Sequence, residues 1–213
     1  MSPEADYVAI RQAVGHYYDG KFAAHGPSAR GVDWNSPESQ ILRFEQLASL
    51  FADDRARFSV NDLGCGYGAL ATFLRERGYA ATYAGYDLSP VMVEHARMSF
   101  RDDPHVRFRE GTGLLPADYS VASGIFNVRL DFGEGEWATY VAETIAQLAR
   151  ASRKGFAFNM LTSHSDEDRK RPDLYYADPC ETFEACRARF SRHVALLHDY
   201  GLWEFTIRVR LAS

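Results

Sequence analysis

Three glycines stand at alternate positions in the segment Asp62-Leu63-Gly64-Cys65-Gly66-Tyr67-Gly68. Glycine allows the backbone to turn sharply and a ligand to approach the main chain closely. A loop that cradles the pyrophosphate of a dinucleotide would need its last glycine at position 69, where this chain has Ala69. The spacing therefore favours a nucleoside ligand that lies against the loop and places no pyrophosphate there.

A second acid follows at a distance suited to a ribose. Asp87 lies 25 residues beyond Asp62, at the end of the next apolar run. A carboxylate at this place can accept hydrogen bonds from both hydroxyls of a ribose. The Asp62 carboxylate would repel a pyrophosphate. The two acids therefore strengthen the interpretation of the glycine segment as a nucleoside-binding loop.

The pattern around these residues predicts an α/β fold. From about residue 58 onward, short apolar runs alternate with longer amphipathic ones, as in a parallel sheet covered by helices. The predicted strands cover 58–63, 81–86, 106–109, 121–128, 155–161, 194–197 and 205–209, and the predicted helices cover 69–77, 90–100 and 136–150. The link between the last two strands, with Asp199-Tyr200-Gly201 at its centre, is short enough for an antiparallel hairpin. We therefore expect a doubly wound, seven-stranded, mostly parallel sheet with an antiparallel C-terminal hairpin.

The N-terminal part has a different pattern. Helices are predicted over 4–21 and 37–51, the second capped by Asn35 or Ser36, and the segment between them is rich in turn-forming residues. We expect a single domain over residues 1–213. In it, residues 1–54 form an N-terminal helical cap or lid, and residues 55–213 form the ligand-binding core.

The glycine segment and Asp87 resemble the S-adenosylmethionine (SAM) binding motifs of class I methyltransferases. The resemblance covers residues 55–165 closely, and the predicted hairpin extends it towards the C-terminus. It implies that the glycine loop lies beneath the methionine and ribose of SAM, that Asp87 binds the ribose, and that Asp62 lies near the positively charged amino end. Two positions differ from the family. Gly111-Thr112 stands where Gly-Asp is usual, and Ser120 stands where the fourth strand usually opens with Asp.

By this resemblance SAM is the cofactor and S-adenosylhomocysteine (SAH) is its product. The residues expected to contact the cofactor come from the glycine segment, from the ends of the following strands and from the N-terminal segment. They are Asp62, Gly64, Cys65, Gly66, Gly68, Asp87, Leu88, Met92, Gly111, Thr112, Asn127 and Trp34.

Three residues are candidates for a part in the reaction. Methyl transfer from a sulfonium is an in-line displacement, so proximity, orientation and exclusion of water matter most, and a hydroxyl or ammonium acceptor also benefits from a base. His164, after the fifth predicted strand, is the candidate base, and an exposed loop histidine is the alternative. Arg129 would pair with an anionic substrate group, or is an ordinary surface arginine. Tyr17 would close over the site, or only packs the cap against the sheet.

Composition and charge argue against several classes of partner. The chain has 24 Lys and Arg against 29 Asp and Glu, a net charge of −5, so it is poorly suited to gripping nucleic acid. It has no apolar run long enough to span a membrane and no secretory signal pattern. Its cysteines, Cys65, Cys180 and Cys186, lack the spacing of metal ligands. We expect no membrane or metal partner, reduced thiols and a cytoplasmic location.

These observations predict a SAM-dependent methyltransferase that transfers a methyl group to an oxygen or nitrogen of a small-molecule metabolite. Two alternatives stay open at this point. One is a methyltransferase-like regulatory module that binds SAM without transfer, and the other is a nucleotide-dependent oxidoreductase on a similar sheet. The sequence specifies neither the methyl acceptor nor the oligomeric state.

Overall fold

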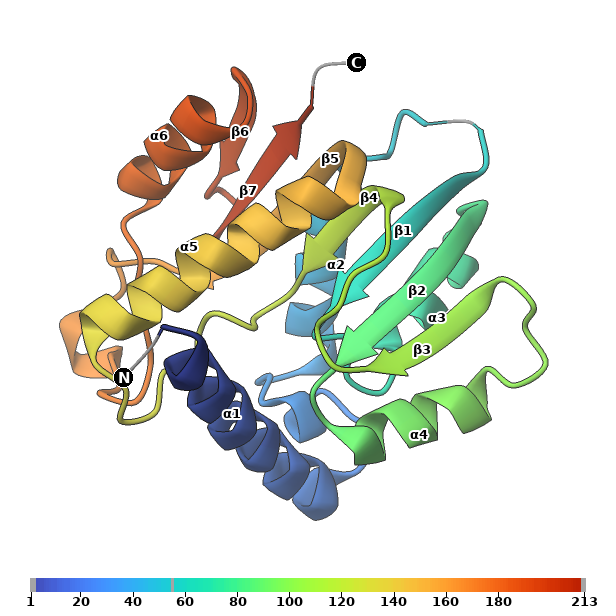
Figure 1. Cartoon of the computed structure of the whole chain (residues 1–213), viewed down its shortest axis with the longest axis horizontal. Helices are drawn as coiled ribbons and strands as arrows, with labels where there is room; N and C mark the ends of the chain where they lie inside the picture. Colours follow the sequence, from blue (N-terminus) through green and yellow to red (C-terminus); the bar gives the residue numbers. More distant parts are fainter. Residues whose placement is uncertain (1–2, 55, 212–213) are drawn as a thin grey trace.

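A computed structural model describes residues 3–54 and 56–211 and contains one seven-stranded sheet (Figure 1). The strands lie in the order β3-β2-β1-β4-β5-β7-β6. Their bounds are β1 Phe58–Leu63, β2 Ala81–Asp87, β3 Val106–Glu110, β4 Ala117–Ala122, β5 Ser152–Leu161, β6 His193–Leu197 and β7 Glu204–Arg210. The first five strands pair in parallel, while β7 runs antiparallel to both β5 and β6. The predicted sheet and its C-terminal hairpin are confirmed.

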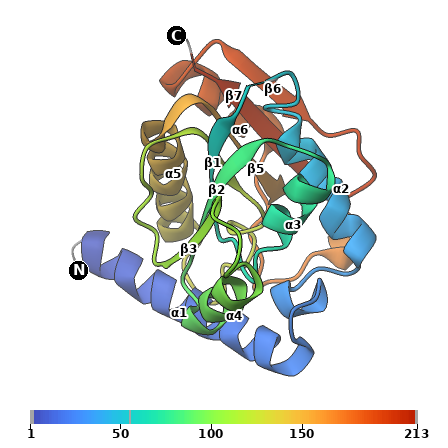
Figure 2. The same cartoon turned by 90° about the vertical axis from the view of Figure 1, so that its right-hand side faces the viewer.

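Helices cover both faces of the sheet (Figure 2). One face packs against α2 (Pro37–Ala48), α3 (Ala69–Glu76) and α4 (Pro90–Ser99), and the other packs against α5 (Glu134–Ala151) and α6 (Pro179–Arg189). Alternate residues of a strand point to opposite faces. In β1, for example, Val60 belongs to the first of these cores and Leu63 to the second.

Local sequence explains where several helices begin. The Ser36 side chain accepts a hydrogen bond from Ser39 N, and Ser89 does the same for Met92 N, so each caps its helix. In both cases a proline follows at the first helical position, where it needs no hydrogen-bond donor. Ser36 is thus the cap of α2, one of the two residues predicted for this role.

The N-terminal helix α1 (Pro3–His25) lies near the edge where β1 and β2 end (Figure 1). It contacts α4, and the Ser89 hydroxyl donates a hydrogen bond to Asp19 on α1. Nearer the start of α1, Ile10 and Val14 are buried in the core shared with α5. A short helical turn, η1 (Arg30–Val32), then connects α1 to α2. The long helix thereby covers the carboxyl edge of the sheet.

The fourth strand lies earlier in the chain than the predicted range 121–128. β4 ends at Ala122, and the chain then turns at Gly124, which has a positive φ of 72°. The apolar residue Phe126 resembled a strand residue, but it is fully buried from a loop and packs against Phe158. Its burial, and not its pairing in the sheet, accounts for the apolar pattern.

The earlier start of β4 also corrects the interpretation of Ser120. Asp118 is the second residue of the strand, so an acid does lie near its opening. Its carboxylate accepts hydrogen bonds from Ser59 N at 2.8 Å and Ser59 Oγ at 2.9 Å and pairs with Arg153. Asp118 therefore joins β4 to β1 at the end of the strands remote from the carboxyl edge.

A buried ion pair attaches α2 to the last strand of the sheet. Arg43 on α2 and Glu204 on β7 are 5% and 1% exposed, and the guanidinium binds both carboxylate oxygens. Arg43 also donates to Ser39 O at 2.8 Å. Because both side chains are almost completely buried, each charge needs the other.

We predict that Glu204→Gln lowers the free energy of unfolding by about 3 kcal/mol, because it leaves a buried arginine without a counter-charge. Replacing both residues by methionine should cost clearly less than this single change. Urea denaturation measures both effects, with Glu184→Gln in an exposed pair as the control that leaves the midpoint unchanged. A single variant as stable as the wild type would contradict the role given to the pair.

Candidate functional site

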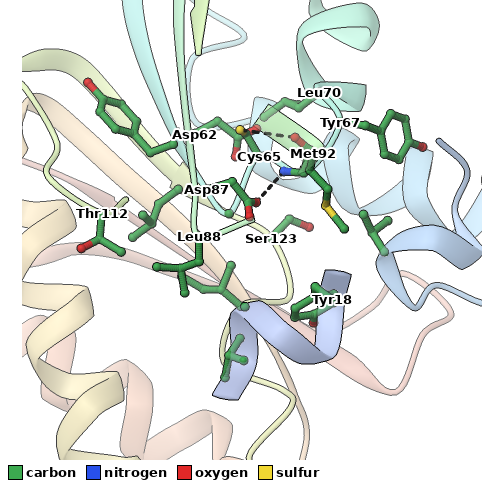
Figure 3. Close-up of a pocket in the computed structure, with 18 of the residues that line it drawn as sticks. Tyr18, Asp62, Cys65, Tyr67, Leu70, Asp87, Leu88, Met92, Thr112 and Ser123 are labelled. Carbon is green, nitrogen blue, oxygen red and sulfur yellow. Dashed lines mark hydrogen bonds between the residues drawn. The ribbon is translucent and has the colours of Figure 1, made fainter. Parts of the chain in front are cut away.

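A cavity of about 980 Å³ including its open mouth lies at the carboxyl ends of β1 and β2, between the sheet edge and α1 (Figure 3). Its walls come from the glycine segment, from the loops after β2, β3 and β4, and from α1, α2, α4 and α5. Of the residues predicted to bind a cofactor, the following line it: Asp62, Gly64, Cys65, Gly66, Asp87, Leu88, Met92, Gly111, Thr112 and Trp34. The fold thus brings most of the predicted set into one place.

The glycine segment adopts the conformation expected of it. Gly64, Gly66 and Gly68 all have positive φ, which side chains other than glycine rarely adopt. A Cβ on Gly64 would lie 2.1 Å from Ile125, so any other residue would clash there. Gly68 does not line the cavity, because it faces Phe100 and Phe108 behind the loop. It therefore supports the turn without touching a ligand.

Asp87 holds the glycine loop in place. Its carboxylate accepts hydrogen bonds from Gly66 N at 2.7 Å and from Ser89 N at 2.9 Å. Burial raises its pKa, and hydrogen bonds from main-chain N–H groups act in the opposite direction. A carboxylate that accepts only two hydrogen bonds still has free lone pairs, so it can also accept the hydroxyls of a ribose.

Asp62 offers a carboxylate oxygen with no partner. The side chain is 2% exposed, and its Oδ2 accepts a hydrogen bond from Tyr83 at 2.5 Å. Its Oδ1 is buried and receives no hydrogen bond from any described residue. Burial raises the pKa of Asp62 to about 7, the Tyr83 hydroxyl opposes this rise, and the charge of Asp87 adds to it. Such an orphaned acceptor suits a positively charged ligand group.

The remaining wall of this cavity was not predicted. Tyr140, Thr144 and Gln147 reach it from successive turns of α5, and Gln147 donates a hydrogen bond to Thr112 O. Arg11 and Tyr18 reach it from α1. The spacing of four and three residues on α5, and of seven on α1, places each set on one helical face, but such spacing is equally typical of core packing. Only the placement of α1 over the sheet edge reveals their role.

A second cavity, of about 1350 Å³ including its open mouth, adjoins the first. It is lined by the segment before α2, the loop after β4, the end of β5 and the segment that follows β5. Among its residues are Asn127, Val128, Leu161, Leu174, Tyr176 and Trp203. Tyr18, Val32 and Trp34 line both cavities, so the two spaces meet at these side chains.

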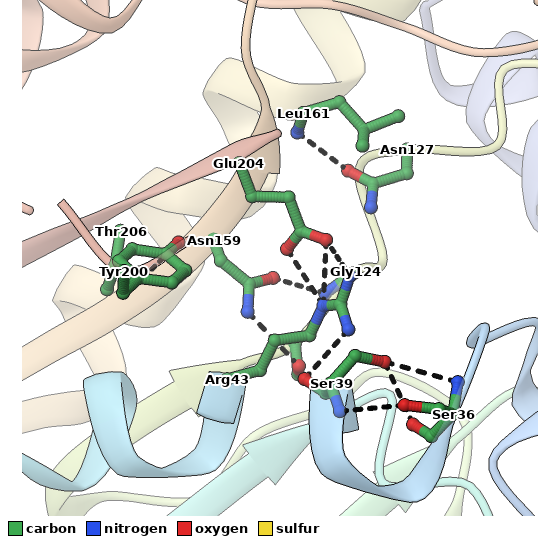
Figure 4. A network of polar contacts seen from close by, with 11 residues as sticks. Ser36, Ser39, Arg43, Gly124, Asn127, Asn159, Leu161, Tyr200, Glu204 and Thr206 are labelled. Carbon is green, nitrogen blue, oxygen red and sulfur yellow. Dashed lines mark hydrogen bonds and ion pairs between the residues drawn. The ribbon is translucent and has the colours of Figure 1, made fainter. Parts of the chain in front are cut away.

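Trp34 stands between the two cavities. The Arg43 guanidinium carbon lies 3.7 Å from the centre of its ring, a cation–π contact. On the loop after β4, a Cβ on Gly124 would lie 2.2 Å from the indole. Trp34 can therefore lie against the main chain only because residue 124 is glycine. The Arg43 guanidinium that contacts the indole is itself held by the Glu204 carboxylate (Figure 4).

The residues predicted to take part in the reaction are not brought together. His164 is exposed and lines neither cavity, and its ring centre lies 6.0 Å from that of His198. Tyr17 binds the Asp33 carboxylate at 2.6 Å. Arg129 donates to the main-chain oxygens of Phe132 and Pro172, beside the second cavity. Asn127, predicted to bind the cofactor, lines the second cavity and not the first.

Comparisons with known proteins agree with this site. A family model described as a methyltransferase domain matches residues 60–155. A protein of Mycobacterium tuberculosis that carries the name methyltransferase is 54% identical over 157 residues, which are 73% of this chain and 95% of that protein. The chain belongs to the class I SAM-dependent methyltransferases. This membership sets aside the oxidoreductase alternative.

Solved structures show the same methyltransferase fold. Magnesium protoporphyrin IX methyltransferase from Synechocystis, with bound SAM, has a TM-score of 0.64 and 16% identity, with 97% of each chain covered. Phosphoethanolamine N-methyltransferase 1 of Haemonchus contortus has a TM-score of 0.67 and 13% identity, and covers all of this chain and 50% of its own. The cyclase SpnF has a TM-score of 0.62 and 19% identity, with 88% of this chain and 74% of its own covered.

The first cavity of this methyltransferase suits SAM. The unpartnered Oδ1 of Asp62 matches the amino group of the methionine part, and Asp87 matches the ribose. A Cβ on Gly66 would approach Val32 and Met92, which also line the cavity. SAM supplies an electrophilic methyl group on a sulfonium, and the protein supplies orientation and exclusion of water. In the described part of the chain, no group of three or more His, Cys, Asp or Glu side chains could hold a metal, and no helix could cross a membrane.

The raised pKa of Asp62 predicts that cofactor binding depends on pH. Below about pH 7 the carboxyl is protonated and no longer attracts an ammonium group, so SAH affinity should fall about tenfold per pH unit there and level off above. Calorimetric titration between about pH 5.5 and pH 8.5 measures this. Asp62→Asn should bind weakly at every pH without the slope. Asp118→Asn, which lies outside the cavity, is the control.

Proposed function

We propose that this methyltransferase transfers the methyl group of SAM to an oxygen or nitrogen atom of a small molecule held in the second cavity. The observation that carries the proposal is the meeting of the two cavities at Tyr18, Val32 and Trp34. An acceptor in the second cavity would meet the cofactor where these side chains border both cavities. In-line transfer requires this arrangement of the two partners.

The transfer needs little from the protein beyond this placement. A lone pair of the acceptor forms the new bond to the methyl carbon, the sulfur–methyl bond breaks, and its electron pair stays on sulfur, which leaves neutral SAH. An N–H or O–H acceptor also loses its proton to solvent or to a base. The cover formed by α1 limits the entry of water to the reacting atoms.

The carboxylates of the second cavity are mostly engaged elsewhere. Asp33 accepts from Tyr17 and Lys21, both at 2.6 Å, and Glu204 pairs with Arg43. Asp166 lines the cavity from an exposed position. This arrangement favours an acceptor that is nucleophilic without a dedicated base, such as a neutral amine or an acidic hydroxyl.

The size and charge of the acceptor follow from the same cavity. Its lining mixes aromatic side chains with single charges of both signs, and the chain as a whole is acidic. A nucleic acid would need a continuous basic surface. We therefore propose a metabolite and not a polymer as the acceptor.

Asp87 provides the first test. Asp87→Ala removes the ribose acceptor and the support of Gly66, so SAM and SAH should bind at least about tenfold to a hundredfold more weakly. Calorimetric titration of both ligands measures the loss, and Asp118→Asn should bind like the wild type. Unchanged binding in Asp87→Ala would contradict the assignment of the first cavity.

Transfer itself is tested with methyl-labelled SAM and a cell extract divided into small-molecule, protein and RNA fractions. Label should enter the small-molecule fraction and disappear with Asp87→Ala. His164→Ala should leave the labelling rate unchanged within about twofold, because His164 lies outside both cavities. Label confined to protein or RNA would contradict a small-molecule acceptor, and a cofactor-binding protein that labels none of the fractions would be a regulatory module.

A further inference from the structure

Asn127 is a buried polar side chain on the wall of the second cavity. It is 5% exposed and follows β4 on the loop that also carries Gly124. Its main chain is fixed on both sides: Asn127 N donates to Gly124 O at 3.2 Å, and Tyr175 N donates to Asn127 O at 2.8 Å. The side chain therefore starts from a rigid point of the fold.

The orientation of the Asn127 amide is also determined. Leu161 N donates to its Oδ1 at 3.2 Å, and a main-chain N–H can only be a donor, so the oxygen must face Leu161. The Nδ2 then lies on the other side of the group, as Figure 4 shows. This nitrogen donates to no group of the described residues and is not sealed in the protein interior, because Asn127 lines the cavity.

Apolar and aromatic side chains share this cavity with charged ones. Trp34, Val128, Leu161, Leu174 and Tyr176 line the same cavity. The guanidinium of Arg43 is already bound to Glu204 and to Ser39 O. Because the Asn127 amide is held in one orientation, its Nδ2 determines which polar atom of a ligand can be buried beside it.

We propose that Asn127 selects the methyl acceptor by donating a hydrogen bond from Nδ2 to an oxygen atom of it. The acceptor then presents a carbonyl, hydroxyl or carboxylate oxygen to this nitrogen. This inference rests on the proposed function of the second cavity. An acceptor that presents only N–H groups at this place would leave both its own donor and that of Asn127 without a partner.

Three ring compounds of nearly equal shape test the proposal. They are 1-indanone, which has a carbonyl acceptor, indoline, which has an N–H group, and indane, which has neither. With the protein saturated with SAH, ligand-observed NMR should give 1-indanone about five- to tenfold tighter binding than indane, as expected for one hydrogen bond to a buried donor. Indoline should bind no better than indane.

Two variants connect this preference to Asn127. Asn127→Asp at about pH 8 keeps an acceptor for Leu161 N but replaces the donor by a second acceptor, so the preference for 1-indanone should vanish and indoline should gain. Asn127→Leu should abolish all discrimination among the three. Ser165→Ala is the matched control, because its hydroxyl in the same cavity already donates to Thr162 O at 2.8 Å, and the preference should persist.

The outcomes separate this inference from the proposed function. Both Asn127 variants should bind SAH like the wild type, since Asn127 does not line the first cavity. Three results would overturn the role of Asn127. The wild type could bind 1-indanone and indane equally, or it could bind none of the three compounds. The preference for 1-indanone could also survive in Asn127→Asp. Methyl transfer to a small molecule in the extract assay would stand independently of that result.

Discussion

The hydrogen bond from Gly66 N to the Asp87 carboxylate is the contact on which the cofactor site depends. It joins the loop after β1 to the end of β2, two neighbouring strands whose ends lie in register at Leu63 and Tyr86. The same carboxylate also accepts from Ser89 N, at the start of α4. A single acid thus fixes the turn, the strand end and the next helix, and its free lone pairs still face the cavity.

The second constraint is electrostatic and acts from the other side of the site. Arg43 and Glu204 are distant in sequence, yet together they attach α2 to β7 and support Trp34. A buried pair of this kind adds little net stability compared with apolar residues, but either charge alone is costly. The pair instead fixes the position of the Trp34 ring at the boundary of the two cavities, opposite the main chain of Gly124.

The sequence was informative where one short segment sets both fold and chemistry. The strand before Asp62, the glycines and Asp87 are close together along the chain, and the conformation of each follows from local rules on turns, caps and strand ends. Prediction failed for the fourth strand, because Phe126 is buried by tertiary packing from a loop and has the same apolar character as a strand residue. Local pattern cannot separate these two causes of burial.

The wall of the second cavity could not be predicted from local sequence patterns. Its wall combines Trp34 from the N-terminal segment, Asn127 after β4 and Leu161 at the end of β5, so no window of sequence contains it. Whether the Asn127 amide is a donor or an acceptor towards the cavity depends on a single contact with the Leu161 main chain. That contact exists because β5 continues beyond β4 and reaches the turn after Ala122. Cofactor recognition therefore follows from a local motif, whereas acceptor recognition depends on how distant strands end relative to one another.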